Sequence, residues 1–253
     1  MQLKNKVALV TGGSRGIGRA ISLAFAEEGA DVVVNYYRAK AEADEVVGKI
    51  REMGQHAIAV QADVAIAEHV NRIVEKALEE FGRIDILVNN SGWVKATPFL
   101  EMSVEEWDRG IAINLRGVFL CGQAVARVMV QNGIRGKIIN VGSVLGFTPL
   151  PGRAHYGPAK AGVNNLTRIM AHELAPYGII VNGIAPGTVD TGMMEQFYEQ
   201  AGNKEVFAEP IPVGHIGLPE EIAPFAVLLA SDRASFIAGT MILVDGGMLA
   251  CLH

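Results

Sequence analysis

The sequence predicts a single α/β domain over residues 1–253, a doubly wound fold with a seven-stranded parallel sheet flanked by helices. Seven short apolar runs rich in β-branched residues alternate with helical stretches, and no linker or low-complexity segment interrupts them. Half of the residues are hydrophobic, which is ample for one sizeable core. The 29 glycines suit tight turns and close contacts between helices and sheet. Strands joined by helices must run parallel, with right-handed crossovers.

The first strand–helix–strand unit contains a glycine loop. The apolar run Lys6–Val10 is followed by a loop with four glycines in seven residues and then by an alanine-rich helical stretch to Glu28. Gly29 ends that helix, and Asp31–Tyr36 is the second strand. Glycines let the backbone approach a pyrophosphate, and the start of the helix offers it free N–H groups. The unit predicts a Rossmann-type dinucleotide site, although a plain tight turn would show the same glycines. The expected contacts are Gly12, Ser14, Arg15, Gly16, Ile17 and Gly18.

The later elements follow from the same alternation. Ser103 and Glu106 form a capping box that begins a long helix, and Pro219 begins the last helix. Asp245-Gly246-Gly247 ends the last strand. The further strands are expected at 56–61, 84–89, 137–141, 179–185 and 240–244, and the further helices at 39–53, 68–81, 103–132, 154–176 and 219–230.

Five polar or glycine-containing groups come directly after strand ends. Ligands of doubly wound sheets bind at the carboxyl ends of the strands, so these groups are expected to converge on one edge of the sheet. They are Gly12–Gly18, Asp63, Asn90–Gly92, Ser143 and Pro186–Gly187.

Tyr156 and Lys160 form a candidate acid–base pair. They are four residues apart, so on a helix they would lie on the same face. A free tyrosine has a pKa of about 10, and an ammonium beside it favours the phenolate and lowers that pKa. The pair could then give a proton to a carbonyl oxygen, or take one from an alcohol, near pH 7. The same spacing also arises by chance, so its context decides.

With these motifs the sequence resembles the short-chain dehydrogenase/reductase family over residues 5–248. Ser143 stands thirteen residues before Tyr156, as in the family's Ser…Tyr-x-x-x-Lys arrangement, and Asn114 matches its fourth catalytic residue. The residues that match the family's glycine motif T-G-x-x-x-G-x-G are Thr11, Gly12, Gly16 and Gly18.

The resemblance implies an NAD(P)(H)-dependent oxidoreductase that interconverts a secondary alcohol and a ketone by hydride transfer. Tyr156 would be the general acid or base, and Lys160 would lower its pKa and bind the nicotinamide ribose. Ser143 would hold the substrate oxygen, and Asn114 would position a water for proton relay. A non-catalytic NADP(H)-binding sensor on the same fold is the remote alternative.

The resemblance also implies further cofactor contacts. Asp63, with its neighbour Val64, would bind the adenine. Asn90-Ser91-Gly92 matches the family's N-A-G with a serine in place of the alanine. The match to P-G-x-[IV]-x-T, which contacts the nicotinamide amide, consists of Pro186, Gly187, Val189 and Thr191.

The second strand bears on the choice between the two nicotinamide cofactors. NAD-selective members end this strand with an acid, whereas here Tyr36 is followed by Tyr37 and Arg38. Arg15 and Arg38 could bind a 2′-phosphate, so NADP(H) is expected, with NAD(H) as a further cofactor. Both arginines could also be ordinary solvent-exposed charges.

The segment near 188–215 is expected to form a substrate lid. It contains Met193 and Met194, while Trp93, Leu145 and Phe147 would line the opposite wall. Apolar side chains over the site would exclude water from the reaction. The same side chains could instead serve helix packing or oligomer contacts.

Two subfamilies fit the sequence. Residues 132–136 and 211–217 look like glucose 1-dehydrogenases and related sugar or alcohol dehydrogenases, whereas residues 35–38 and 244–248 look like 3-oxoacyl-[acyl-carrier-protein] reductases. Carrier proteins are acidic, and residues 130–132 and Tyr177 lack the basic side chains expected there, although Arg135 and Arg153 could substitute. A small alcohol, ketone or sugar is therefore expected as substrate, with the 3-oxoacyl reductase reading as the alternative.

Composition narrows the partners and the compartment. The net charge is −5 and no basic cluster is longer than two residues, which argues against nucleic acid. Cys121 and Cys251 lack metal-type spacing, so no metal site is expected, and both are interpreted as buried or incidental thiols. No signal peptide and no apolar run long enough for a membrane is recognised, so a cytoplasmic protein is expected. The family resemblance implies a homotetramer built through the two long helices and the C-terminal strand.

Overall fold

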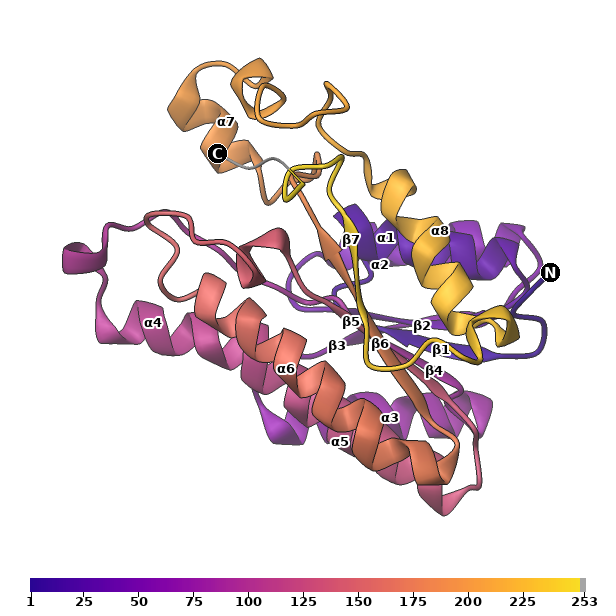
Figure 1. Ribbon diagram of the computed structural model, residues 1–253. Coiled ribbons are helices and arrows are strands. Elements are labelled where there is room, and N and C mark those ends of the chain that lie inside the picture. The colour runs from indigo at the N-terminus through magenta and orange to yellow at the C-terminus, as the bar shows by residue number, and fades with distance from the viewer. Residues whose placement is uncertain (251–253) are drawn as a thin grey trace.

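A computed structural model describes residues 1–250 and shows one parallel sheet in the order β3-β2-β1-β4-β5-β6-β7 (Figure 1). The predicted seven-stranded parallel sheet is confirmed. The order reverses between β1 and β4, and the chain leaves these two strand ends in opposite directions, which creates the ligand crevice of doubly wound sheets. Cys251 lies outside the described residues. The strands are β1 (Val7–Val10), β2 (Asp31–Tyr36), β3 (Ala57–Gln61), β4 (Ile86–Asn89), β5 (Lys137–Val141), β6 (Ile180–Pro186) and β7 (Met241–Val244).

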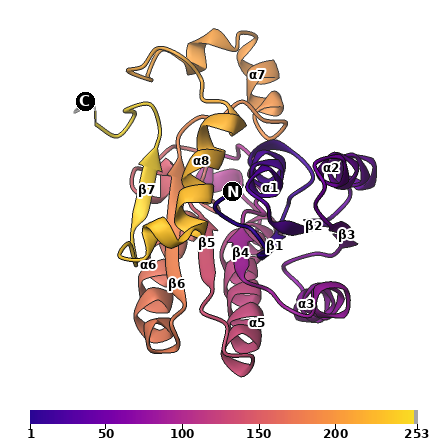
Figure 2. The same ribbon diagram turned by 90° about the vertical axis from the view of Figure 1, so that its right-hand side faces the viewer.

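Helices cover both faces of the sheet (Figure 2). Successive residues of a strand point to opposite faces, so each strand contributes to two cores. Ala8 and Val10 of β1 pack with Phe25 on one face, and Leu9 packs with Met129 on the other. One face carries α1 (Gly16–Glu27), α2 (Lys40–Glu52) and α8 (Pro219–Ala230), and the other carries α3 (Ala67–Phe81), α5 (Gly117–Gln131) and α6 (Gly157–Leu174).

The long helix expected at 103–132 is divided by a π-helical turn. The helix α4 (Val104–Ile111) leads into the turn Ala112–Arg116, and α5 follows directly. Ser103 caps α4 by accepting a hydrogen bond from the Glu106 N–H at 3.2 Å. The expectation that the Glu106 side chain completes the capping box by accepting from the Ser103 N–H is wrong. Its carboxylate binds the Lys95 ammonium at 2.8 Å instead.

The helix expected at 154–176 begins later than predicted. Tyr156 is the N-cap residue of α6, which runs from Gly157 to Leu174. Its backbone is already helical, and its carbonyl accepts the Lys160 N–H at 2.9 Å. The Tyr156 and Lys160 side chains therefore keep the expected one-turn spacing. Most other element ends fall within one or two residues of the expectation.

The segment expected as a lid contains a short helix, α7 (Glu195–Ala201), that the sequence did not predict. It projects beyond the carboxyl edge of the sheet (Figure 1). The two ends of the segment are joined at its base, where the Asp190 backbone N–H donates to the Gly217 carbonyl at 2.8 Å and the Gly217 N–H donates to the Thr188 carbonyl at 3.0 Å. Residues 188–217 thus form a closed insertion between β6 and α8.

The continuous helix Val104–Gln131 is long and apolar enough to cross a membrane, by length and composition alone. The expectation that no such run exists is therefore wrong. In the fold, 44% of its most apolar 18-residue stretch is buried. The apolar side is used for packing, because Cys121, Val125 and Met129 of α5 belong to the core beside α3.

Candidate active site

A cavity of about 1560 Å³ opens at the carboxyl edge of the sheet. Phe147 does not line it, so the expectation for this residue is wrong: it follows a 3₁₀ turn, Val144–Gly146, and its side chain is 46% exposed. Gly18 and Asn114 lie behind the lining. The predicted residues that do line it are Gly12, Ser14, Arg15, Gly16, Ile17, Tyr37, Arg38, Asp63, Val64, Asn90, Ser91, Gly92, Trp93, Ser143, Leu145, Tyr156, Lys160, Pro186, Gly187, Val189, Thr191, Met193 and Met194.

The glycine loop forms a backbone cradle that fits a pyrophosphate. Gly12 and Gly16 have positive φ angles of 62° and 54°, which glycine adopts without strain. A Cβ at Gly18 would lie 2.2 Å from the Gly12 carbonyl oxygen, so this position has room for glycine alone. Arg15, the N-cap residue of α1, makes no side-chain cap, so the N–H groups at the start of the helix stay available to an anion.

Thr11 and Asn90 fasten the ends of β1 and β4 together. The Thr11 hydroxyl accepts from the backbone N–H groups of Asn90 at 2.9 Å and Ser91 at 3.1 Å. In return, the Asn90 side chain donates to the carbonyls of Thr11 at 3.0 Å and Gly12 at 3.1 Å. These bonds hold the crevice in one shape before any ligand arrives.

The residues expected to bind the adenosine lie together at one end of the cavity. Asp63 follows β3, and its Oδ1 accepts from the Ala65 N–H at 2.9 Å, which fixes the carboxylate in the loop. Tyr37 and Arg38 follow β2, with the guanidinium 5.0 Å from the centre of the Tyr37 ring. Arg15 approaches the same cavity from α1. Within residues 1–250, neither arginine forms an ion pair.

Tyr156 and Lys160 lie side by side, with the Lys160 Nζ 5.5 Å from the centre of the Tyr156 ring. Nζ donates to the Val141 carbonyl at 2.8 Å, at the end of β5. Lys160 is 3% exposed, and burial lowers its pKa to about 8. Burial raises the pKa of Tyr156 to about 12, against smaller opposing effects of the Ser143 hydroxyl and the Arg153 charge.

The direction of the Tyr156 shift is opposite to the expectation. The expectation rested on the charge of Lys160 and left out the removal of the phenol from water, which disfavours the phenolate. Removal from water is the largest cause here. With a pKa of about 12, the phenol keeps its proton at neutral pH, as an acid in carbonyl reduction requires.

Asn114 is fully buried in the π-helical turn and holds the backbone of Trp93. Its Nδ2 donates to the carbonyls of Trp93 at 2.7 Å and Gly110 at 2.9 Å. Its Oδ1 accepts from the Trp93 N–H at 3.0 Å. Both amide hydrogens are thus used within the protein. The side chain positions the segment after β4, and its role in a water relay stays a prediction.

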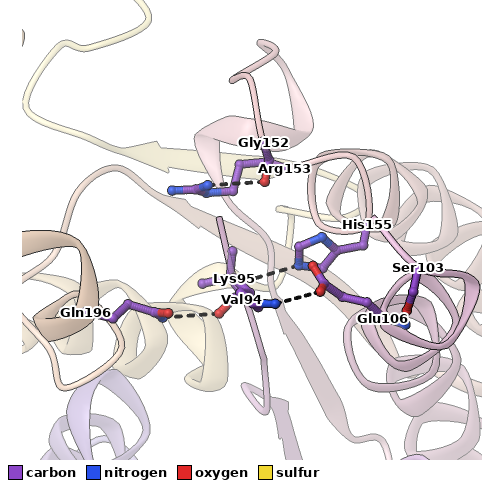
Figure 3. A network of polar contacts seen from close by, with 8 residues as sticks. All are labelled: Val94, Lys95, Ser103, Glu106, Gly152, Arg153, His155 and Gln196. Atoms are coloured by element: carbon purple, nitrogen blue, oxygen red, sulfur yellow. Dashed lines mark hydrogen bonds and ion pairs between the residues drawn. The ribbon is translucent and has the colours of Figure 1, made fainter. Parts of the chain in front are cut away.

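A polar network joins the segment after β4 to the segment that carries Tyr156 (Figure 3). His155 is fully buried, and its Nε2 accepts from the Lys95 N–H at 3.3 Å. The His155 ring lies 5.1 Å from that of Trp93. On the lid side, the Gln196 amide donates to the Val94 carbonyl at 3.2 Å. The network therefore connects three walls of the cavity.

Part of the substrate end was not expected from the sequence. Segment 148–150, before Tyr156, lines the cavity, as does Arg109 of α4, and Phe197 of the expected lid segment lines it too. Arg153, expected as a substitute for basic residues that meet a carrier protein, lines the cavity beside Tyr156. Residues 148–153 stand just before Tyr156 in the sequence, and this closeness could have indicated that they line the cavity.

Comparisons with known proteins agree with this geometry. The sequence model of a family described as Enoyl-(Acyl carrier protein) reductase matches residues 12–249. A 3-oxoacyl-[acyl-carrier-protein] reductase of Synechocystis is 46% identical over 248 residues, 98% of each chain. One from Staphylococcus epidermidis is 43% identical over 96% of this chain and 99% of its own.

Solved structures show the same fold. A short-chain type dehydrogenase/reductase from Mycobacterium marinum superposes with a TM-score of 0.94 at 36% identity, over 99% of this chain and 98% of its own. A putative 2-deoxy-d-gluconate 3-dehydrogenase from Agrobacterium tumefaciens, with bound NADP, gives 0.90 at 36% identity over the same shares. The chain belongs to the short-chain dehydrogenase/reductase family of oxidoreductases.

Proposed function

We propose that the protein reduces the ketone of a 3-oxoacyl thioester with NADPH. The named relatives at 43–46% identity over nearly their full length support this reading over the sugar dehydrogenase that the sequence argument favoured. The observation that carries it is the set of apolar side chains at the substrate end of the cavity, beside a protonated Tyr156. Its lining includes Trp93, Met193 and Phe197. Such a wall suits an acyl chain, whereas a sugar would leave several hydroxyl groups without partners.

Each group of residues has its own role in the proposed reaction. When bound, the nicotinamide cofactor supplies the hydride that reduces the carbonyl carbon. The backbone cradle of the glycine loop holds the pyrophosphate. Ser143 donates a hydrogen bond to the ketone oxygen, and the Tyr156 phenol gives it the proton. The lid excludes water from this step.

We propose NADP(H) as the preferred cofactor. Arg15 and Arg38 are the cations at the adenosine end, and the end of β2 supplies no acid there. A 2′-phosphate could bind both guanidinium groups through charge-assisted hydrogen bonds. The bound NADP of the Agrobacterium tumefaciens structure is in keeping with this choice.

A second candidate is the oxidation of a 3-hydroxy acid. Two arginines, Arg109 and Arg153, line the substrate end, and a carboxylate would complement their charge. The Agrobacterium tumefaciens relative is named for an enzyme that acts at carbon 3 of a sugar acid. The two candidate substrates share one feature. Each has a thioester carbonyl or carboxylate carbon two positions along the chain from the carbon that carries the reacting oxygen.

The test is NADPH oxidation with acetoacetyl-N-acetylcysteamine, with 2-deoxy-D-gluconate plus NADP and D-glucose plus NADP as parallel reactions. We expect rapid turnover of the thioester. Tyr156→Phe should lower kcat/KM about 100- to 10,000-fold and leave NADPH binding, followed by fluorescence titration, intact. Turnover of the sugar acid without the thioester would select the second candidate. Turnover of glucose alone would contradict both.

A further inference from the structure

The two ends of the cavity differ in charge. Its acidic lining residues in the described chain are Glu42 of α2 and Asp63 after β3, both at the adenosine end of the sheet. The substrate end, between the segment after β4 and the lid, is lined by Arg109 and Arg153 with no carboxylate. The protein therefore offers positive charge, unbalanced by its own acids, where the substrate enters.

Arg153 is held rigidly beside the catalytic tyrosine. Its carbonyl accepts the backbone N–H groups of Tyr156 and Gly157, each at 2.9 Å. The guanidinium lies 4.4 Å from the centre of the Phe197 ring in the lid helix α7. Figure 3 shows its side chain extending over Val94 toward the side where Gln196 reaches across from α7. Arg153 is thus fixed with respect to both the proton donor and the lid.

The guanidinium has unused donors. Within residues 1–250 its hydrogen bond is to the Gly152 carbonyl, from Nη1 at 3.2 Å, and it forms no ion pair. The contact with the Phe197 ring is a cation–π contact that needs no N–H···O hydrogen bond, so most of the five N–H donors stay available to a ligand. The group is also half-buried, and the loss of water lowers the pKa of Arg153. A half-buried cation costs free energy unless an oxygen atom of a ligand accepts its free N–H groups.

We propose that Arg153 binds the second oxygen of the substrate, the thioester carbonyl or carboxylate two carbons from the reacting ketone. The ketone oxygen lies at Ser143 and Tyr156, and the second oxygen lies on the Arg153 side. Arg153 is then the residue that selects 1,3-dicarbonyl compounds over simple ketones. The inference rests on the proposed function for the class of reaction, and it covers both of its candidate substrates.

The test compares two substrates that differ in one carbonyl group. Acetoacetyl-N-acetylcysteamine has both oxygens, and S-(3-oxobutyl)-N-acetylcysteamine has a CH₂ in place of the thioester carbonyl. Arg153→Met, Arg153→Lys and the wild-type protein are assayed with both, and acetoacetate serves as the carboxylate substrate. Arg72→Met, an exposed arginine of α3 outside the cavity, is the matched control.

The readout is the ratio of kcat/KM for the dicarbonyl substrate to that for the simple ketone. Arg153 also acts on Tyr156 through its charge, but this effect is common to both substrates and cancels in the ratio. We expect Arg153→Met to lower the ratio about 10- to 100-fold, Arg153→Lys to lower it less, and Arg72→Met to leave it unchanged. An unchanged ratio in Arg153→Met would overturn the inference, whatever happens to the separate rates.

The acetoacetate arm separates this inference from the proposed function. If the wild-type protein ignores the thioester but reduces acetoacetate, and Arg153→Met loses that activity relative to the simple ketone, the thioester reading fails and the Arg153 assignment stands. If the wild-type protein reduces the simple ketone as well as both dicarbonyl compounds, the Arg153 assignment fails. If it reduces none of the three, both ideas fail.

Discussion

At the scale of single residues, burial has more influence than charge pairing in this site. Lys160 and Tyr156 face each other across 5.5 Å, and removal from water moves both toward their neutral forms. A protonated tyrosine and a lysine with a pKa of about 8 suit proton donation to a ketone. The burial of the lysine has a cost that should appear in the stability of the fold.

Lys160→Met should change how the free energy of unfolding depends on pH. The folded protein holds Lys160 with a pKa of about 8, below the usual 10.5 of the unfolded chain. Between these values the unfolded chain binds more protons, so the free energy of unfolding of the wild type rises with pH relative to Lys160→Met. The slope is at most about 1.4 kcal/mol per pH unit. Urea unfolding between pH 7 and 9.5 measures it, below the range where Tyr156 acts in the opposite sense. Parallel curves for the two proteins would contradict the prediction.

Arg38→Ala should weaken the discrimination between the two nicotinamide cofactors. The loss of a charge-assisted pair with a 2′-phosphate raises the KM for NADPH about tenfold or more, and the KM for NADH stays within about twofold. Steady-state kinetics with both cofactors measure the two values. Arg51→Ala, on the outer side of α2, is the matched control. Equal changes for both cofactors would refute the role of Arg38.

Sequence alone identified the strand-end residues well, because the carboxyl edge of a parallel sheet is fixed by the alternation of strands and helices. Asn90 and Ser143 lie in the cavity wall as this reasoning requires. It failed for Phe147, whose direction depends on one short 3₁₀ turn. It also failed for the pKa of Tyr156, because the extent of burial is a property of the packed fold.

At the scale of elements, the π-helical turn between α4 and α5 places Asn114 under Trp93 and brings Gly110 against His155. A Cβ on Gly110 would lie 2.6–2.9 Å from three atoms of the His155 side chain. The helix therefore approaches the segment before Tyr156 closely enough that a methyl group is excluded.

Gly110→Ala should destabilise the protein by about 1–3 kcal/mol, because the added methyl displaces His155 in a filled core. Gly48→Ala, in the middle of α2 with open space around its Cα, should instead stabilise it by about 0.5–1 kcal/mol. Thermal or urea unfolding of the pair measures both signs. Stabilisation by both variants would show that helix propensity, not the His155 contact, governs Gly110.

The alternation of elements could be predicted because each strand and helix has its own local pattern of apolar residues. The interruption of 103–132 could not, since a π-helical turn needs no proline or glycine and is held here by contacts of Asn114 with a distant segment. The helix α7 was missed for a related reason: only Phe197 of its seven residues is buried, so it has little apolar periodicity.

At the scale of the whole molecule, apolar side chains remain exposed on the elements expected to form a tetramer. Phe119 of α5 is 44% exposed and Ile169 of α6 is 46% exposed. Phe236, before β7, is fully exposed, and β7 has an unpaired outer edge in the sheet. Exposed apolar groups and a free strand edge are typical of surfaces that meet another chain.

Phe236→Asp should therefore weaken a homotetramer. We expect the wild type to sediment with four times the chain mass of 27.0 kDa, and the variant to shift toward smaller species because a charge is costly in an apolar interface. Met53→Asp, at an exposed apolar residue directly after α2 and away from these elements, is the control and should keep the wild-type mass. A wild-type monomer, or equal effects of both variants, would contradict the expected assembly.

The closed base of the 188–217 insertion has a consequence for how such proteins diverge. Because the insertion begins and ends at one bridge between Val189 and Gly217, its interior can change in length and side chains without disturbing the register of β6 or the start of α8. Mutations that alter the substrate can accumulate there while the proton donor and the cofactor cradle stay intact. A lineage with this fold can thus acquire a new substrate through one contiguous stretch of its gene, which accords with relatives of similar fold named for thioesters and for sugar acids.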